Sequence, residues 1–346
     1  MKRFWFGLAF VTGALCAGSA RAQLSLFDLP RVSPHALVSQ RIGLTDITVE
    51  YHRPAVRGRR IWGNLIPYNK VWRAGANENT TVAFSTRVTI GGRQLDAGTY
   101  GLHMIPGKPY WIIVLSRAYR SWGSFTYDPA EDAVRITVMP KTCPHQERLL
   151  YTVEDITDTS ARVVMRWEQL QVSFEVQVNT PDVVVSSLRE QLRGLQRFTW
   201  RGWYEAAEWC AHNNTNLDEA LGWIERSIHM MPNFSNYMVK ALLLDRLNRS
   251  DEAEPVREAA LKTASEPEIV SFGTDLIMDG LVADAVTVFR KNASMHPDSW
   301  VAHDSLADAY LRQGKLKNAK REWKRALKLA PDATQRKRIQ RILDKL

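Results

Sequence analysis

The chain has 346 residues, of which 45% are hydrophobic and 24% are charged, and its formal net charge is +9. This composition excludes a disordered chain, and the length is sufficient for two hydrophobic cores. Three cysteines are too few for a disulfide scaffold, and no His or Cys spacing is typical of a metal site, so we expect neither a metal nor a cofactor.

The first residues predict a secretory signal peptide at 1–22. Lys2 and Arg3 precede the apolar run 4–17, and Ala20 and Ala22 are small residues at the two positions that a signal peptidase reads. The run is shorter than the roughly 20 apolar residues that span a membrane. We therefore expect export to the periplasm or the extracellular medium, and no transmembrane segment in the mature chain.

Cleavage after residue 22 lowers the formal charge from +9 to +6, because three cations and no acidic residue leave with the peptide. In an exported protein, this surplus favours glycans, phosphate groups, peptides or membrane surfaces over nucleic acid as partners.

The residues that follow, to about 182, predict an antiparallel β-sandwich. Apolar and polar residues alternate in 47–51 and in 88–95, where Gly91-Gly92 is a strong hairpin signal. Further strand-like runs are 98–105, 111–116, 134–139, 149–154, 161–167 and 172–178. No segment with helical periodicity separates these runs, which favours a sandwich or barrel for residues 23–182.

At Asn179-Thr180-Pro181-Asp182 the pattern changes, and residues 183–346 predict helix pairs. The expected fold is thus α+β multidomain. We also expect Trp200, Trp203, Trp209 and Trp223 to pack the junction between the two parts.

The helical part contains an internal repeat. Four residues recur 34 positions later with the same or a similar type: Gly280 and Gly314, Ala285 and Ala319, Phe289 and Trp323, Pro297 and Pro331. Small Ala lets two paired helices approach, the aromatic residue fills the space between them, and Pro ends the second helix. We expect a solenoid of three to four helix pairs that engages a protein or peptide partner.

The stretch 51–81 is the predicted functional site, because it carries many polar side chains and two Trp between strand-like regions. Arg offers a fork for carboxylate or phosphate, Trp a stacking face, and Asn and Glu can hold hydroxyl groups. The candidate residues for a small polar, anionic or carbohydrate ligand are Arg53, Arg59, Trp72, Arg73, Asn77, Glu78, Thr80 and His103.

Two alternatives remain open. The same residues can form a closed internal network in which Arg73 pairs with Glu78. Alternatively, Glu78 and His103 can serve as the acid and base of a cell-envelope hydrolase.

Residues 30–180 resemble the exported bacterial family DUF2911, a domain of unknown function. The resemblance rests on Ser33-Pro34, Tyr51-His52-Arg53-Pro54, Gly58-Arg59, Ile61-Trp62-Gly63, the run 71–78 with Thr80, Ala97-Gly98-Thr99-Tyr100, Trp122-Gly123 and Glu147. It implies a β-rich domain that is often followed by helical repeats, and it transfers no activity. The helical part similarly resembles tetratricopeptide repeats, whose concave surface usually holds peptides or partner proteins.

Overall fold

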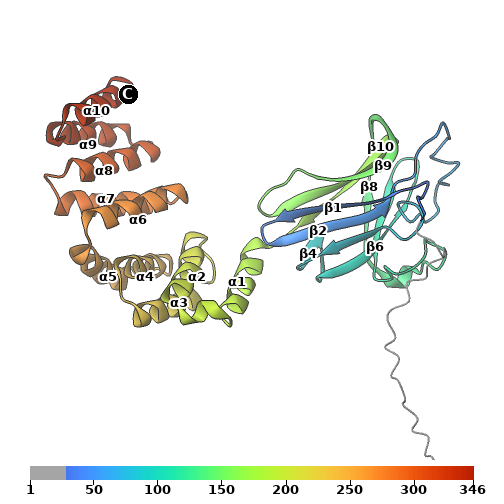
Figure 1. Ribbon diagram of the computed structural model, residues 1–346, viewed down its shortest axis with the longest axis horizontal. Helices are drawn as coiled ribbons and strands as arrows, with labels where there is room; N and C mark the ends of the chain where they lie inside the picture. Colours follow the sequence, from blue (N-terminus) through green and yellow to red (C-terminus); the bar gives the residue numbers. More distant parts are fainter. Residues whose placement is uncertain (1–28) are drawn as a thin grey trace, which may run out of the picture.

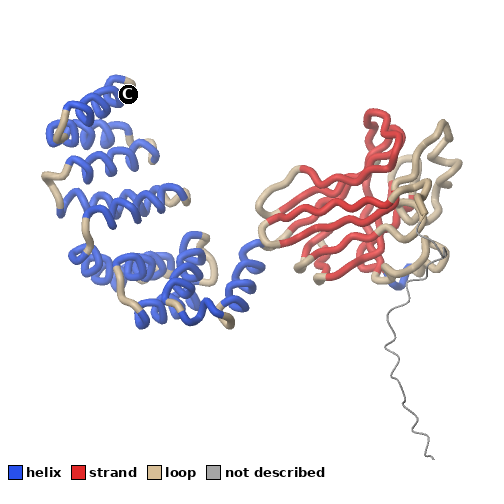
Figure 2. Tube along the Cα trace, viewed as in Figure 1, coloured by secondary structure: helices blue, strands red, loops and turns tan. Residues whose placement is uncertain are grey.

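A computed structural model describes residues 29–346, so the predicted signal peptide lies outside the described residues. In the described part, ten strands come first and ten α-helices follow (Figure 1). Figure 2 shows the same division, with the strands gathered in one region and the helices in another.

Six strands form the larger sheet, in the order β1-β2-β3-β6-β7-β8, with every neighbouring pair antiparallel. They are β1 (His35–Ile42), β2 (Thr45–His52), β3 (Thr81–Phe84), β6 (Gly98–Ile105), β7 (Trp111–Ser116) and β8 (Asp132–Val138). A short 3-10 helix, η1 (Pro129–Glu131), precedes β8. The long connection from β2 to β3, residues 53–80, contains no regular strand or helix.

Four strands form the smaller sheet, in the order β5-β4-β10-β9. They are β4 (Val88–Ile90), β5 (Arg93–Leu95), β9 (Lys141–Glu154) and β10 (Ser160–Gln177). Gly91 and Gly92 join β4 to β5 with φ angles of 56° and 77°. A two-residue hairpin of this kind needs positive φ at both positions, so the predicted hairpin is confirmed.

Both sheets contribute side chains to a single core. Tyr51 of β2 contacts Tyr151 of β9 at a ring-centroid distance of 4.7 Å, and the Tyr151 backbone N–H donates to the Tyr51 hydroxyl at 3.1 Å. Four tryptophans form the centre of this core: Trp62, Trp72, Trp111 and Trp167. The antiparallel β domain is confirmed, while the sandwich arrangement of its sheets stays a prediction.

The helices stack into a curved array (Figure 1). They are α1 (Thr180–Gln191), α2 (Trp200–His212), α3 (Leu217–Met230), α4 (Phe234–Arg246), α5 (Ser250–Thr263), α6 (Glu266–Met278), α7 (Val282–Met295), α8 (Trp300–Arg312), α9 (Leu316–Leu329) and α10 (Ala333–Asp344). The 3-10 helix η2 (Leu195–Phe198) lies between α1 and α2. The predicted helical array after the β domain is confirmed.

The repeated residues have the structural roles that their spacing predicts. Gly280 and Gly314 follow the ends of α6 and α8 with φ angles of 79° and 77°, a conformation that glycine adopts without strain. Ala285 and Ala319 are fully buried, and the aromatic rings of the next turn fill the space between paired helices.

Helix α1 connects the two cores. Asn179 accepts a hydrogen bond from the Asp182 N–H and begins the helix. Val183 packs against the β core, while Val185 belongs to the helical core. Trp203 and Trp223 belong to the helical core and line a pocket together with Arg189 of α1, while neither belongs to the β core. The predicted tryptophan packing at the junction stays a prediction.

Between residues 29 and 346, no helix combines the length and the apolar composition that a membrane span requires.

Candidate functional site

The connection 53–80 is held in place by hydrogen bonds to two strands. Trp72 and Met104 of β6 exchange two backbone hydrogen bonds of 2.8 Å. The Tyr151 hydroxyl of β9 donates to the Ala74 carbonyl at 2.9 Å. The segment is therefore hydrogen-bonded to one strand of each sheet, although it forms no strand of its own.

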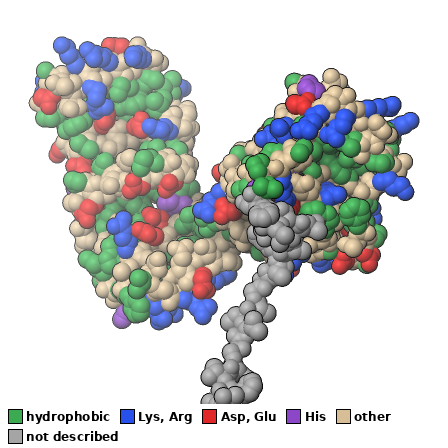
Figure 3. Space-filling view, turned by 45° about the vertical axis from the view of Figure 1, so that its right-hand side comes forward, with side chains coloured by type: hydrophobic (Ala, Val, Ile, Leu, Met, Phe, Trp, Pro, Cys, Tyr) green, Lys and Arg blue, Asp and Glu red, His purple; other side chains and the backbone are tan. Residues whose placement is uncertain are grey.

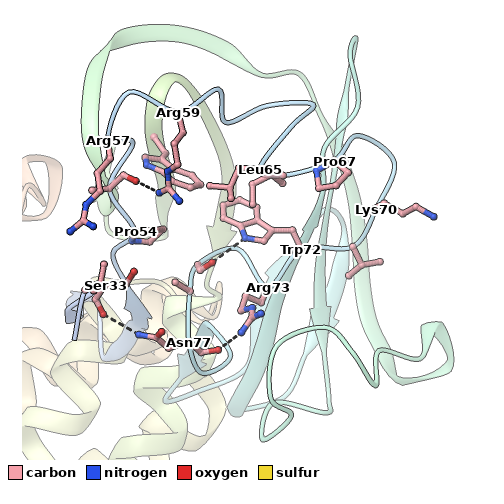
Figure 4. Close-up of a pocket in the computed structure, with 17 residues that line it drawn as sticks. Ser33, Pro54, Arg57, Arg59, Leu65, Pro67, Lys70, Trp72, Arg73 and Asn77 are labelled. Carbon is pink, nitrogen blue, oxygen red and sulfur yellow. Dashed lines mark hydrogen bonds between the residues drawn. The ribbon is translucent and has the colours of Figure 1, made fainter. Parts of the chain in front are cut away.

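This connection lines a pocket of about 410 Å³, within the range that ligand pockets occupy. Four of the predicted site residues lie in its wall: Arg59, Trp72, Arg73 and Asn77. Figure 4 shows Arg59 and Arg73 on opposite sides of the pocket, with Trp72 and Leu65 along one wall and Pro54 facing them.

The pocket wall is cationic. Four of its residues carry positive charge and none is Asp or Glu: Arg57, Arg59, Lys70 and Arg73 are the cations. Figure 3 shows Lys and Arg side chains grouped on the visible face of the β domain, beside hydrophobic ones. An anion in this pocket therefore gains favourable charge interactions, whereas a cation is repelled.

Backbone carbonyl groups orient the two facing arginines. Arg59 Nε donates to the Val56 carbonyl at 3.0 Å, and its Nη2 donates to the Ala55 carbonyl at 2.5 Å. Arg73 Nη1 donates to the Asn77 carbonyl. Arg59 Nη1 and Arg73 Nη2 make no hydrogen bond to the described residues, which leaves them as donors for a ligand.

The Arg73 guanidinium is also packed beneath a neighbouring loop. It lies over the Phe125 ring at 5.6 Å from the centroid, and a Cβ added to Gly123 would be 2.7 Å from its Cζ. Burial lowers the pKa of Arg73, with a smaller opposing effect from the Glu78 charge. Burial thus disfavours the charged form, and a bound anion would compensate for it.

Trp72 is both a pocket wall and part of the core. Its ring stacks on Trp167 at 5.8 Å, and its Nε1 donates to the Gly75 carbonyl at 3.0 Å. The side chain is 8% exposed. Only a small part of the ring therefore remains for contact with a ligand.

Asn77 forms the part of the pocket wall that contacts the segment before β1. Its Nδ2 donates to the Ser33 carbonyl at 3.1 Å, which holds residues 32–33 against the site. Figure 4 shows this contact beside the one between Arg73 and the Asn77 carbonyl.

Four predicted site residues are not in the pocket wall: Arg53, Glu78, Thr80 and His103. Arg53 Nε donates to the Leu149 carbonyl at 2.8 Å and so attaches the segment to β9. Thr80 is fully buried, and its Oγ1 occupies the space where a Cβ on Gly75 would lie. Arg53 and Thr80 therefore hold the segment in place and do not face the pocket.

Glu78 is bound by other side chains. Arg31 Nη1 donates to both of its carboxylate oxygens, at 2.6 and 2.7 Å, and His52 Nε2 lies 3.3 Å away. Burial opposes the ionisation of Glu78, but the hydrogen bond from Arg31 and the nearby positive charges outweigh it and lower the pKa. The alternative pairing of Glu78 with Arg73 is not formed.

His103 lies in a separate environment. It is 2% exposed, its Nδ1 is 3.0 Å from Ser124 Oγ, and its ring contacts Tyr127. Burial lowers the pKa of His103 to about 4. No hydrogen bond or ion pair joins His103 to Glu78, so the structure does not bring the acid and base of the hydrolase alternative together.

Several pocket residues were not among the predicted site residues. Arg57 and Lys70 lie in the same stretch of sequence, and their charge was a usable signal. Val32 and Ser33 come from the segment before β1, and no local pattern indicates that they fold back against Asn77. Within residues 29–346, no group of three or more His, Cys, Asp or Glu side chains is arranged to hold a metal ion.

Comparison with solved structures finds helical repeat proteins. MamA (residues 41 to the end) from Desulfovibrio magneticus RS-1 is 18% identical, with 44% of this chain and 86% of that chain covered and a TM-score of 0.26. TTC0263, a thermophilic TPR protein of Thermus thermophilus, is 19% identical, with 47% and 91% covered and a TM-score of 0.28. YrrB, described as a TPR protein with an unusual peptide-binding site, is 18% identical, with 45% and 81% covered and a TM-score of 0.25.

No curated protein sequence matches the chain. The family described as protein of unknown function (DUF2911) matches residues 33–176, and the tetratricopeptide repeat family matches residues 300–333. The chain thus joins a β domain that matches the DUF2911 family to a helical array in which residues 300–333 match the tetratricopeptide repeat family.

Proposed function

We propose that the protein is an exported binding module. Its β domain, to about residue 182, holds a small anionic ligand in the pocket lined by residues 53–80, and its helical array engages a protein or peptide partner. The observation that carries the ligand proposal is Arg73, a partly buried cation whose pocket contains three further cations and no carboxylate.

A partly buried charge without a compensating partner costs free energy. Glu78, the nearest carboxylate in the same segment, is already engaged by Arg31 and His52. A bound carboxylate or phosphate would accept the remaining Arg73 N–H groups in charge-assisted hydrogen bonds.

The tetratricopeptide repeat at residues 300–333 supports a role in protein interaction. Support for the location of a partner comes from a second pocket, of about 440 Å³, between α6, α8 and α10. Its wall combines apolar groups with both signs of charge, including Met278, Asp308, Arg312 and Arg338. A peptide with mixed polar and apolar side chains fits such a surface.

The ligand proposal is tested by titration calorimetry of the full chain with inorganic phosphate and with small carboxylates. We expect at least one anion to bind, and Arg73→Gln to weaken it about tenfold or more, because a charge-assisted hydrogen bond contributes about 1.5–3 kcal/mol. Arg93→Gln, an exposed arginine on β5, is the matched control and should change little. Absence of binding by any anion, or equal affinity in Arg73→Gln, contradicts the proposal.

Export is tested separately by determining the N-terminus of the protein recovered from the periplasm and the medium. A chain that begins at Gln23 supports the proposed signal peptide. A chain that stays in the cytoplasm with its first 22 residues intact contradicts export but leaves ligand binding unaffected.

A further inference from the structure

Two arginines of the pocket are held apart by the fold. Arg59 is fixed by the carbonyl groups of Ala55 and Val56, and Arg73 by the carbonyl group of Asn77. Figure 4 shows their guanidinium groups on opposite sides of the pocket. Because separate turns hold the two groups, neither can swing to the other side without losing its hydrogen bonds.

The wall between the two arginines is apolar. Pro54, Leu65, Ile66 and Trp72 line it, and only a small part of Trp72 is exposed. In Figure 4, the Lys70 side chain points away from this space. A small inorganic ion bound to one arginine would not cover the apolar wall and would not reach the guanidinium group of the other arginine.

We propose that the ligand is a dianion with an apolar middle, of the dicarboxylate class, with one acidic group on Arg59 and the other on Arg73. This inference rests on the proposed function of the pocket and specifies its ligand. Each acidic group receives a guanidinium that the backbone has already oriented, so little side-chain order is lost on binding. The hydrocarbon between the acidic groups covers the apolar wall and displaces water from it.

Calorimetric titrations of the full chain test the proposal with three kinds of probe. The first is a series of straight-chain dicarboxylates from succinate to suberate, the second is hexanoate, and the third is inorganic phosphate. We expect one dicarboxylate to bind about tenfold or more tightly than hexanoate and phosphate, because it alone gains a second charge-assisted contact. The monomethyl ester of that dicarboxylate should bind like hexanoate, a comparison that needs no variant.

Variants then assign the two ends. Arg59→Gln and Arg73→Gln should each reduce binding of the best dicarboxylate to the level of its monomethyl ester. Arg93→Gln is the matched control, since it removes a charge from an exposed arginine of β5 outside the pocket, and it should retain the dicarboxylate preference.

Three results overturn parts of the inference. If hexanoate, phosphate or the monomethyl ester binds as tightly as the best dicarboxylate, the two-ended ligand is wrong while anion binding stands. If Arg59→Gln retains the full preference, the second anchor is wrong. If no anion binds at all, the proposed function of the pocket fails as well.

Discussion

Gly123 lies directly against the guanidinium group of Arg73, and its φ angle is +64°. A side chain at this position meets both a strained backbone conformation and the arginine. The residue therefore links the loop 117–128 to the pocket. Gly123 thus lies beside the pocket without belonging to its wall.

We expect Gly123→Ala to displace Arg73 and weaken anion binding, and to reduce stability by about 1–2 kcal/mol through the positive φ alone. Gly92→Ala is the matched control, because Gly92 has a φ of +77° and no atom within 4 Å of an added Cβ. Urea unfolding and anion titration of both variants separate the two effects. Equal loss of affinity in both variants would show that Gly123 has no special relation to Arg73.

We expect His103 to make the stability of the β domain depend on pH. Burial lowers its pKa from 6.5 to about 4, so the unfolded chain binds a proton more readily than the folded one between these values. The contribution of His103 to the free energy of unfolding is fully present above pH 6.5. It is lost as the pH falls toward 4, and the loss is about 3 kcal/mol at most.

In His103→Gln, the free energy of unfolding should fall less between pH 7 and pH 5 than in the unchanged protein, as measured by urea unfolding. The lower limit, pH 5, lies about one unit above ordinary carboxyl pKa values. The lower limit keeps most carboxylates ionised, since Glu154, for example, has a pKa of about 2 because of its hydrogen bonds from Arg166 and Thr152. An unchanged slope in the variant would exclude His103 as its cause.

At the scale of the elements, the stability of the helical array depends on the positions where neighbouring helices approach closely. Gly273 of α6 faces Phe289 of α7, and a Cβ on Gly273 would be 2.4 Å from the ring. Gly222 of α3 also lies inside a helix, but an added Cβ there would meet no atom within 4 Å. The two glycines thus differ in packing rather than in secondary structure.

Gly273→Ala should destabilise the array by about 1–3 kcal/mol through overpacking. Gly222→Ala should stabilise it by about 0.5–1 kcal/mol, because alanine has the higher helix propensity. Circular dichroism of thermal unfolding measures both. Stabilisation by Gly273→Ala would mean that the space between Gly273 and the Phe289 ring can hold a methyl group.

At the scale of the whole molecule, the described residues form a large β core and a large helical core, and α1 contributes side chains to both. Chains with more than one core commonly depart from two-state unfolding. A change inside one core should therefore leave the stability of the other almost unaltered.

Scanning calorimetry should resolve two transitions. Gly273→Ala should lower one of them, and Gly123→Ala the other, while an anion that occupies the pocket should raise only the transition that Gly123→Ala lowers. A single transition that moves as a whole in both variants would mean that the β domain and the array unfold as one unit.

Local sequence patterns predicted most of the strands and the change to helices after them, but not β1 or β3. The Gly91-Gly92 hairpin and the glycines at 280 and 314 were predictable because each depends on backbone conformation within a few residues. The stretch that carries Arg59, Trp72, Arg73 and Asn77 could be singled out by composition, since polar side chains and glycines cluster there.

The membership of the pocket was decided only by tertiary contacts. Asn77 bonds to Ser33 across 44 positions, and Arg31 binds Glu78 across 47. Thr80 is buried against Gly75, and His103 lies with Ser124 on another part of the domain. Sequence alone determined which side chains carried charge; chain folding over long separations determined which charges were neutralised and which still face the pocket.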